Sequence, residues 1–294
     1  MTNAGDPLGP YRGRLLGLAY RMLGSRSEAE DVLQDAWLRY SGVDPETVRN
    51  EEAFFVTTVT RLCLDRLKSA RARREIYVGP WLPEPVFDTE ELSPHSAVEL
   101  ADDLSFALLL TLQRLSAAER AAFLLHDVFE TPFSEVADAL GKSEAACRQL
   151  AARARKAVAA NRPEKRPPPE QHRALLHGFI AAMESGDAAK LKALLAADAV
   201  AMTDGGGVKR AALNPILGAE KVARFFAGLM NKLRRRGQSL SFEPATVNGE
   251  PALVFYIEGE LDQTLSIAVD DGLIRAVYAV RNPEKLRAPG AQLH

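Results

Sequence analysis

Cysteine is scarce in this sequence, which has only Cys63 and Cys147 among its 294 residues. Two isolated thiols, each inside an apolar helical pattern, exclude a disulfide framework and a cysteine-based metal site. No apolar run approaches the length of a membrane span, and no charged-then-apolar leader precedes a cleavage site. We therefore expect a cytoplasmic protein with no metal, no cofactor and no membrane partner.

The sequence also lacks an overall basic charge, because 37 Lys and Arg residues face 39 Asp and Glu residues. Basic residues are nevertheless concentrated in two places. Residues 52–74 carry six against two acidic residues, and residues 142–166 carry eight against two. Such local patches are typical of DNA-binding surfaces. They are also typical of solvated helix faces, so each patch alone leaves both interpretations open.

Turn signals and changes of periodicity divide the chain into five segments, 8–75, 76–100, 101–160, 161–171 and 172–286. The first and third have helical periodicity. The second includes the proline-rich stretch GPWLPEP, which excludes a helix interior, and the fourth is a charged, proline-rich spacer. The fifth alternates helical and strand patterns, which predicts an α+β domain with two or three helices against a curved antiparallel sheet.

Local signals place the helix ends in the two helical segments. Ser27 with Glu30 predicts one capping box and Ser116 with Glu119 a second. Thr131-Pro132 is typical of a helix start, and LGKS at 140–143 of a stop, a tight turn and a new start. Two short helices around such a turn predict a helix-turn-helix. In the first segment, an apolar stripe is predicted from Val32, Leu33, Trp37 and Leu38, and a second buried face from Phe55, Val56, Val59, Leu62, Cys63 and Leu67.

A mixed acidic and apolar helix face suits docking on a basic partner helix, although a solvated face over a core stripe is the alternative. The segment RLLGLAYRMLGSRSEAEDVLQDAWLRY (14–40) resembles region 2 of extracytoplasmic-function (ECF) sigma factors. In that family the AEDVLQDAW stretch grips the β′ clamp helices of core RNA polymerase. The resemblance assigns this contact to Asp31, Gln34, Asp35 and Leu38.

The following segment, FFVTTVTRLCLDRLKSARARRE (54–75), resembles the part of region 2 that recognises and opens the −10 promoter element. Promoter opening needs cations along the backbone and a surface for an unstacked base. Core packing is expected for Phe55, whereas Phe54 is placed at the DNA edge. The expected −10 residues are Asn50, Phe54, Arg61, Arg66, Lys68, Arg71, Arg73 and Arg74.

The segment FSEVADALGKSEAACRQLAARARKA (133–157) resembles sigma region 4, which reads the −35 element with its second helix and docks on the polymerase β flap. Side chains in the first turns of such a helix meet base edges, and later basic ones meet phosphates. The base-edge set is Ser143, Glu144, Ala145, Arg148 and Gln149. The phosphate set is Arg153, Arg155 and Lys156.

The last segment resembles the SnoaL-like branch of the NTF2-like fold, and three short motifs resemble the ECF41-type group of sigma factors. That group has a WLPEP linker, a DGGGK-like loop and an NPDKL-like terminus. Here Val208 separates the glycines from Lys209, and Glu284 replaces the aspartate. The motif residues are Trp81, Leu82, Pro83, Glu84, Pro85, Asp204, Gly205, Gly206, Gly207, Asn282, Pro283, Glu284, Lys285 and Leu286.

Trp81 and Leu82 are apolar residues in a segment without a core of its own, so they need a surface. We expect the tail domain to supply it, and expect docking of this proline-stiffened segment to regulate the spacing of the two DNA-binding domains. Local packing of Trp81 on region 2 is the alternative.

Two other functions compete with a sigma factor. One is a helix-turn-helix regulator with a ligand-sensing tail. The other is an enzyme that uses His172, His177 or Asp204 in a tail cavity, although we expect no catalytic residues. A small ligand of that cavity stays an open question.

Overall fold

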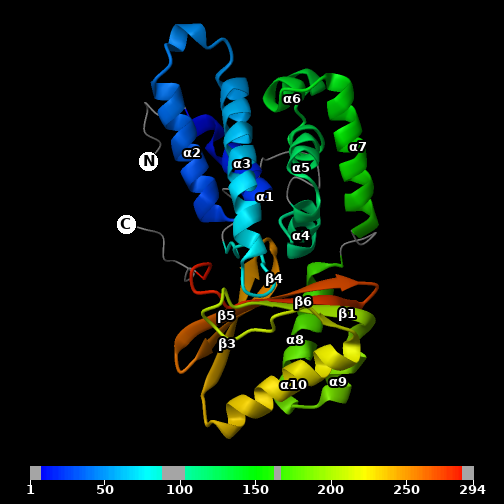
Figure 1. Ribbon diagram of the computed structural model, residues 1–294. Helices are drawn as coiled ribbons and strands as arrows, with labels where there is room; N and C mark the ends of the chain where they lie inside the picture. The colour runs from blue at the N-terminus through cyan, green and yellow to red at the C-terminus, as the bar shows by residue number, and fades with distance from the viewer. Residues whose placement is uncertain (1–7, 88–102, 162–166, 287–294) are drawn as a thin grey trace. The chain divides into compact units, whose positions relative to one another are not determined.

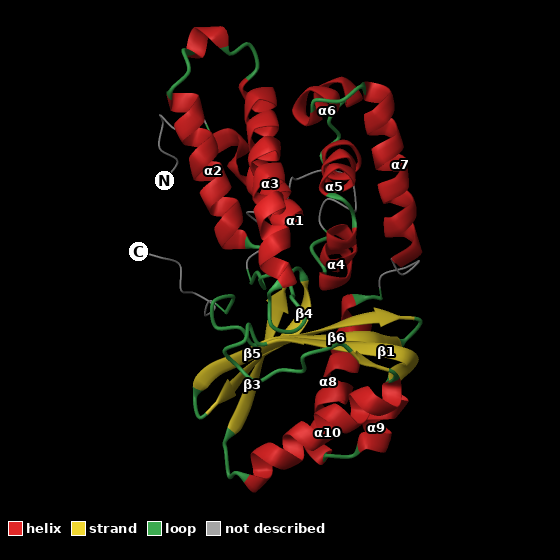
Figure 2. Cartoon of the chain, in the orientation of Figure 1, coloured by secondary structure: helices red, strands yellow, loops and turns green. Residues whose placement is uncertain are grey.

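The computed structural model describes residues 8–87, 103–161 and 167–286 (Figure 1). The chain forms two compact units. One contains residues 1–75 and 88–162, and the other contains residues 76–87 together with 163–294. The WLPEP segment is therefore part of the same unit as the C-terminal domain. Figure 2 shows strands only in the second unit.

The first unit begins with a short 3₁₀ turn, Gly9–Tyr11, and three helices: α1 (Arg12–Leu23), α2 (Arg26–Ser41) and α3 (Glu51–Glu75), with a second 3₁₀ turn at Pro45–Thr47. Helix α1 ends at Gly24, whose left-handed φ of 74° suits glycine. The cap of α2 is Ser25, whose side chain accepts from the Glu28 backbone N–H. The predicted box at Ser27 was therefore wrong by two residues, and Ser27 instead bonds the Ser25 hydroxyl.

The same unit continues with α4 (Phe106–Arg114), α5 (Ala117–Phe123), a π-helical turn (Leu124–Val128), α6 (Phe133–Leu140) and α7 (Glu144–Asn161). The capping box at Ser116 and Glu119 is confirmed. Helix α6 starts one residue later than its proline signal suggests, because Pro132 is the cap. Gly141 then ends α6 in the left-handed conformation and the Ser143 hydroxyl accepts from the Ala146 N–H, as expected for a helix-turn-helix.

The second unit opens with α8 (Pro169–Ser185), α9 (Ala188–Ala193) and β1 (Leu195–Asp204), followed by β2 (Ile216–Leu217) and α10 (Ala219–Arg235). Helix α8 takes in the last three residues of the predicted spacer, because a proline is well placed in the first helical turn. Gly186 ends α8 in the left-handed conformation, and the Asp187 carboxylate caps α9.

Four strands complete this unit: β3 (Leu240–Val247), β4 (Glu250–Ile257), β5 (Glu260–Asp270) and β6 (Leu273–Val280). The strand order is β2-β1-β6-β5-β4-β3, and only β1 and β6 pair in parallel. The core lies between the sheet and α8, α9 and α10, and includes Phe179, Phe226 and Phe255. The helical regions and the α+β domain confirm the expected fold class, but the sheet is mixed rather than antiparallel as predicted, because β1 pairs with β6 in parallel.

The parallel pairing of β1 with β6 positions the candidate regulatory residues. Asp204, the last residue of β1, is opposite Val280, the last residue of β6. Parallel strands end at the same edge of a sheet, so the loop after Asp204 and the segment after Val280 leave side by side. The glycine motif and the NPEKL motif therefore meet there, although 74 residues (208–281) separate them in the sequence.

His172 is a buried residue of α8 that the sequence left as a catalytic candidate. Its Nε2 has no hydrogen-bond partner within the described chain, and burial lowers its pKa from 6.5 to about 4. The folded state therefore resists protonation that the unfolded chain accepts below about pH 6.5. Stability from the neutral ring is present above that pH and is lost as pH falls from 6.5 towards 4.

We predict that the free energy of unfolding falls by about 2 kcal/mol between pH 7 and pH 5 through His172, with a smaller fall in His172→Leu. Urea unfolding can follow Trp81 fluorescence in a Trp37→Phe background, since these are the two tryptophans. His177 is exposed on the same helix, so His177→Leu is the matched control and should keep the wild-type slope. Equal slopes in all variants would contradict the prediction.

Candidate functional sites

The predicted polymerase-binding residues lie on an exposed face of α2. Asp31, Gln34 and Leu38 are exposed, and Asp35 is half-buried. The apolar stripe predicted here was partly wrong, because Trp37 and Leu38 have exposed fractions of 42% and 54%. The residues of α2 that enter the core are Ala29, Val32, Leu33, Ala36 and Tyr40. An exposed tryptophan and leucine beside carboxylates form a surface suited to a partner protein.

Arg66 connects this acidic face to α3. Its guanidinium donates to Asp35 at 2.8 Å, to Asp31 at 3.4 Å and to the backbone carbonyl of Glu28 at 3.2 Å. The sequence assigned Arg66 to DNA and the two aspartates to polymerase, but the structure places all three together. Asp31 still has a side chain that is 64% exposed, so the pairing leaves it accessible.

The other residues expected at the −10 element are in varied settings. The Asn50 side chain accepts from the Ala53 N–H at the start of α3, and Phe54 is half-buried against Tyr40 and Phe55. Lys68 is exposed and pairs with Asp65. The side chains of Arg71, Arg73 and Arg74 lie outside the described part of the chain.

Arg61, expected at DNA, contacts the helix-turn-helix instead. Its guanidinium donates to the backbone carbonyls of Asp138 at 2.7 Å and Ala139 at 3.3 Å. These carbonyls belong to the last turn of α6, where a helix carries unpaired acceptors and partial negative charge. Arg61 thus caps α6, and DNA at this side chain would have to displace that contact.

The predicted −35 residues are all on the exposed side of α7 or at its start. The opposite side enters the core through Cys147, Leu150, Ala151, Ala154 and Val158. Glu144 pairs with Arg148, which also lies over the Phe133 ring at 5.3 Å. Arg153 and Arg155 pair with Glu119 and Asp127 of neighbouring elements. The side chain of Lys156 is exposed.

Asp204 is the centre of a docking site for the WLPEP linker. Its fully buried carboxylate accepts from the Tyr77 hydroxyl at 2.6 Å, the Leu82 N–H at 2.8 Å and the Gly206 N–H at 3.1 Å. Lys285 Nζ forms an ion pair with it at 2.8 Å. Four donors around one buried carboxylate satisfy it fully, which is the condition for a stable buried charge.

Lys285 joins the NPEKL motif to the linker. Its Nζ donates to the Leu82 carbonyl and lies 4.0 Å from the centre of the Trp81 ring. An ammonium over an indole face is a favourable cation–π contact, most of all when it is shielded from water. Only 12% of the Lys285 side chain is exposed. Trp81 and Leu82 therefore pack on the tail domain, as expected.

The rest of the linker is buried alongside. Leu82, Pro83, Glu84 and Pro85 are all buried, and Val86 exchanges two hydrogen bonds with Asn248 at the β3–β4 turn. In the terminal motif, Asn282 is buried and its amide donates to the Tyr77 hydroxyl at 3.0 Å. Pro283 and Glu284 are exposed, and Leu286 is half-buried.

The triple glycine has a steric role at this dock. Gly206 and Gly207 adopt left-handed φ values of 62° and 75°. A Cβ at Gly206 would overlap the Asn282 side chain, and one at Gly205 would overlap the Lys209 carbonyl. Space therefore requires glycine at 205, backbone conformation favours it at 207, and both requirements apply at 206.

Sequence reasoning missed several residues of the dock. Tyr77 has no motif signal, although burial, followed by its bond to Asp204, raises the pKa of its phenol and keeps it a donor. Asn248, at the β3–β4 turn, lies 162 positions from its partner Val86. Lys209 does not join the dock: it pairs with Asp262, which also accepts a bidentate contact from Arg281. The contacts of Tyr77, Asn248 and Lys209 join residues far apart in the sequence, so local patterns do not reveal them.

The described residues contain no group of three or more His, Cys, Asp or Glu arranged to hold a metal. Burial raises the pKa of the Cys63 thiol, so it stays protonated. In the same ranges, no helix combines the length and apolar character needed to cross a membrane.

Known proteins match both helical regions of this chain. Residues 9–73 match the model for sigma-70 region 2, and residues 105–158 match that for sigma-70 region 4. The chain is 40% identical over 286 residues to the ECF RNA polymerase sigma factor SigJ of Mycobacterium tuberculosis, covering 93% of this chain and 90% of that protein.

It is also 30% identical over 285 residues to the probable ECF RNA polymerase sigma factor SigI of the same organism, covering 96% and 94%. The crystal structure of M. tuberculosis SigJ superposes with a TM-score of 0.73 and 34% identity, covering 94% of this chain and 95% of that one. The similarity therefore includes the tail domain as well as both helical regions.

Proposed function

The chain belongs to the family of ECF RNA polymerase sigma factors, and we propose that it directs core polymerase to promoters through three surfaces, under control of its own tail. The exposed face of α2 binds the β′ clamp helices, α3 engages the −10 element, and α7 reads the −35 element while its domain docks on the β flap. This work takes place in the cytoplasm. Sequence similarity to two ECF sigma factors, which extends over more than nine-tenths of this chain, supports the assignment.

In this proposal the SnoaL-like tail regulates rather than catalyses. The observation that carries it is the buried Asp204–Lys285 pair, which holds the linker between the two DNA-binding regions. When residues 76–87 are docked on the tail domain, they no longer form a free part of the segment that connects α3 to α4. An equilibrium between docked and undocked linker would therefore set how far apart the two DNA-binding regions can lie. Neither His172, His177 nor Asp204 lines the cavity of the tail domain, which disfavours the enzymatic alternative.

Run-off transcription with core polymerase tests this function. We predict that full-length protein supports specific initiation, and that Trp81→Ala with Leu82→Ala changes the yield about tenfold, since both side chains are lost from the docked linker. A chain cut before Pro169 should change it in the same direction. Matched alanine substitutions of exposed Val208 and Leu213 are the control. Failure to bind core polymerase would remove the sigma-factor mechanism, whereas unchanged yields would remove only the regulation.

Promoter reading by α7 makes a separate prediction. At a promoter selected in vitro, Gln149→Ala should cost about 1–3 kcal/mol and relax preference at one base pair, because a side chain in the first turns meets a base edge. Lys156→Ala should weaken all sequences alike and reduce the salt slope by about 1, because a phosphate contact is lost. Measured affinities across single-base variants and salt concentrations separate the two. Indistinguishable behaviour would contradict the assigned placement.

A further inference from the structure

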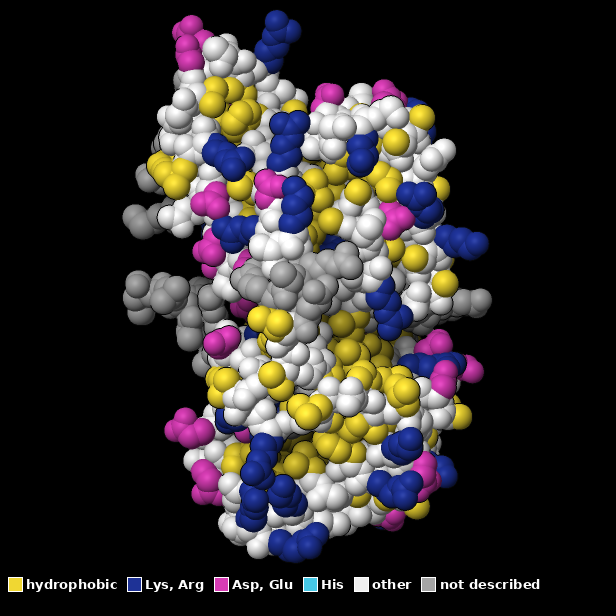
Figure 3. Space-filling model, in the orientation of Figure 1, with side chains coloured by type: hydrophobic (Ala, Val, Ile, Leu, Met, Phe, Trp, Pro, Cys, Tyr) yellow, Lys and Arg dark blue, Asp and Glu magenta, His cyan; other side chains and the backbone are white. Residues whose placement is uncertain are grey.

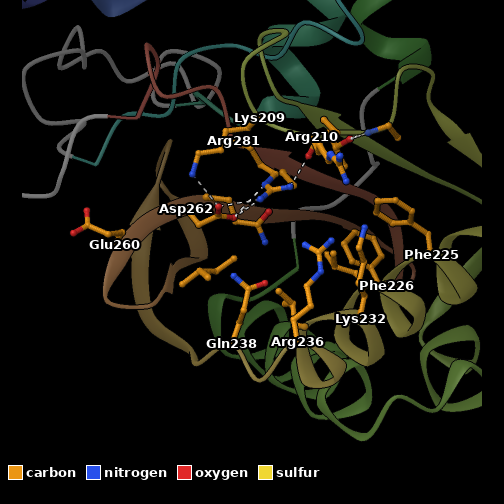
Figure 4. Close-up of a pocket in the computed structure, with 18 of the residues that line it drawn as sticks. Lys209, Arg210, Phe225, Phe226, Lys232, Arg236, Gln238, Glu260, Asp262 and Arg281 are labelled. Atoms are coloured by element: carbon orange, nitrogen blue, oxygen red, sulfur yellow. Dashed lines mark hydrogen bonds and ion pairs between the residues drawn. The ribbon is translucent and has the colours of Figure 1, made fainter.

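The tail domain contains a cavity separate from the linker dock. It has a volume of about 620 Å³ and lies between α10 and the sheet, with walls from the 203–212 segment, the second half of α10 and the ends of β4, β5 and β6. Figure 4 shows side chains from α10 pointing towards those from the sheet. This volume is in the range of sites that bind small organic molecules.

The cavity is cationic. Its lining has five basic residues, Lys209, Arg210, Lys232, Arg236 and Arg281, against three carboxylates, Glu258, Glu260 and Asp262. Asp262 is already paired with Lys209 and Arg281, and Glu260 points away from the labelled cluster in Figure 4. Among the described residues, no carboxylate forms an ion pair with Lys232 or Arg236. Lys232 and Arg236, one helical turn apart, thus both line the cavity without a carboxylate partner in the described chain.

The other walls are apolar. Phe225, Phe226, Leu229, Leu233 and Ile257 line the cavity beside the basic residues. Figure 3 shows Lys and Arg side chains gathered at a hollow lined by hydrophobic side chains on this domain. A purely inorganic anion would leave the apolar walls in contact with water. A neutral apolar molecule would leave the cations unmatched.

We propose that this cavity binds an amphipathic organic carboxylate, with its charge at Lys232 and Arg236 and its apolar body against Phe225, Leu229 and Ile257. The proposal deepens the regulatory function assigned to the tail and rests on it for its biological role. Charge-assisted bonds to the carboxylate supply orientation, and burial of the apolar body supplies most of the affinity.

The cavity is directly connected to the linker dock. Arg281, which lines the cavity, donates its backbone N–H to the Asp204 carbonyl at 2.7 Å, and its chain neighbour Asn282 bonds Tyr77. On the other wall, the Lys209 N–H donates to the Gly205 carbonyl at 2.9 Å. A ligand that orders these two walls also orders the Asp204 loop. Occupancy therefore stabilises the docked linker, and equally the docked linker favours occupancy.

Calorimetric titration of the full-length protein with decanoate and 1-naphthoate tests the site, with decanamide and 1-naphthamide as neutral counterparts. We expect each carboxylate to bind saturably and about tenfold more tightly than its amide. Lys232→Gln with Arg236→Gln should abolish that difference. The matched control is Arg234→Gln with Arg235→Gln, which removes the same charge from the same helix end outside the cavity and should leave binding unchanged.

Equal affinity of acids and amides, or equal loss in the control variant, would overturn the site. Coupling is measured in the same samples by hydrogen exchange at the Leu82 amide, which decanoate should slow. Binding without any effect on that amide would refute the connection to the dock. The effect of Trp81→Ala with Leu82→Ala on run-off transcription needs no added ligand, so it would persist if only the ligand site were wrong.

Discussion

Replacing Lys285 with methionine should release the WLPEP linker from the tail domain. The substitution leaves the Asp204 carboxylate buried without its cation, and breaking such a pair by removing one partner costs about 3–5 kcal/mol. The Leu82 amide, which donates to that carboxylate at 2.8 Å, reports the change directly. We expect its hydrogen exchange to accelerate by roughly a hundredfold or more, because opening of the linker exposes this amide to water.

Two further variants make that experiment specific. Asp204→Asn with Lys285→Met removes both charges and should restore part of the lost protection, because no unpaired charge then remains buried. Lys190→Met removes a lysine from an exposed position of α9 and should change nothing. If Leu82 exchanged at the wild-type rate in Lys285→Met, the ion pair would not hold the linker.

Reversing the charge of Asp31 together with Leu38→Ala should weaken binding to core polymerase by about a hundredfold. Both side chains are exposed on α2, so the loss reflects a missing contact rather than a damaged core. Fluorescence anisotropy of labelled protein with core enzyme measures the affinity. Asp198→Lys with Leu213→Ala is a matched exposed pair in the tail domain and should bind normally.

Arg66→Gln separates the two roles of the acidic face. This variant removes the internal partner of Asp31 and Asp35 while it leaves both carboxylates available. Its affinity for core polymerase should stay within about fivefold of wild type, because both carboxylates remain available for the contact and loss of a partly exposed ion pair changes free energies by about 1 kcal/mol or less. Normal binding by the Asp31 and Leu38 variant would refute the assignment of this face.

The predictable parts of the fold were those with local signals. The Asn248-Gly249 and Asp271-Gly272 turns have positive φ at both residues, a conformation that Asn-Gly and Asp-Gly pairs favour, so such hairpin turns carry a local signal. The short strand β2 and the π-helical turn have no such signal and were missed. At α2 the prediction chose Ser27, whereas the folded helix is capped by Ser25, two residues earlier.

The candidate sites were predictable only where a motif named the residues. Helical spacing could not show whether Trp37 faces the core, because the buried and the exposed faces of α2 both carry apolar residues. It could not reveal that Arg66 turns towards Asp35, or that Arg61 reaches the end of α6, since these contacts join residues 31 and 77–78 positions apart. Tertiary packing, and not local sequence preference, determines which partner each of these arginine side chains contacts.

The parallel pairing of β1 with β6 has a consequence for the order of events on the ribosome. Lys285 lies 203 positions after Leu82, so the residue that secures the linker emerges long after the linker itself. At typical synthesis rates of about 5–20 residues per second, the delay is roughly 10–40 s. Every newly made molecule therefore passes through a period in which both helical regions have left the exit tunnel but Lys285 cannot yet bind the linker.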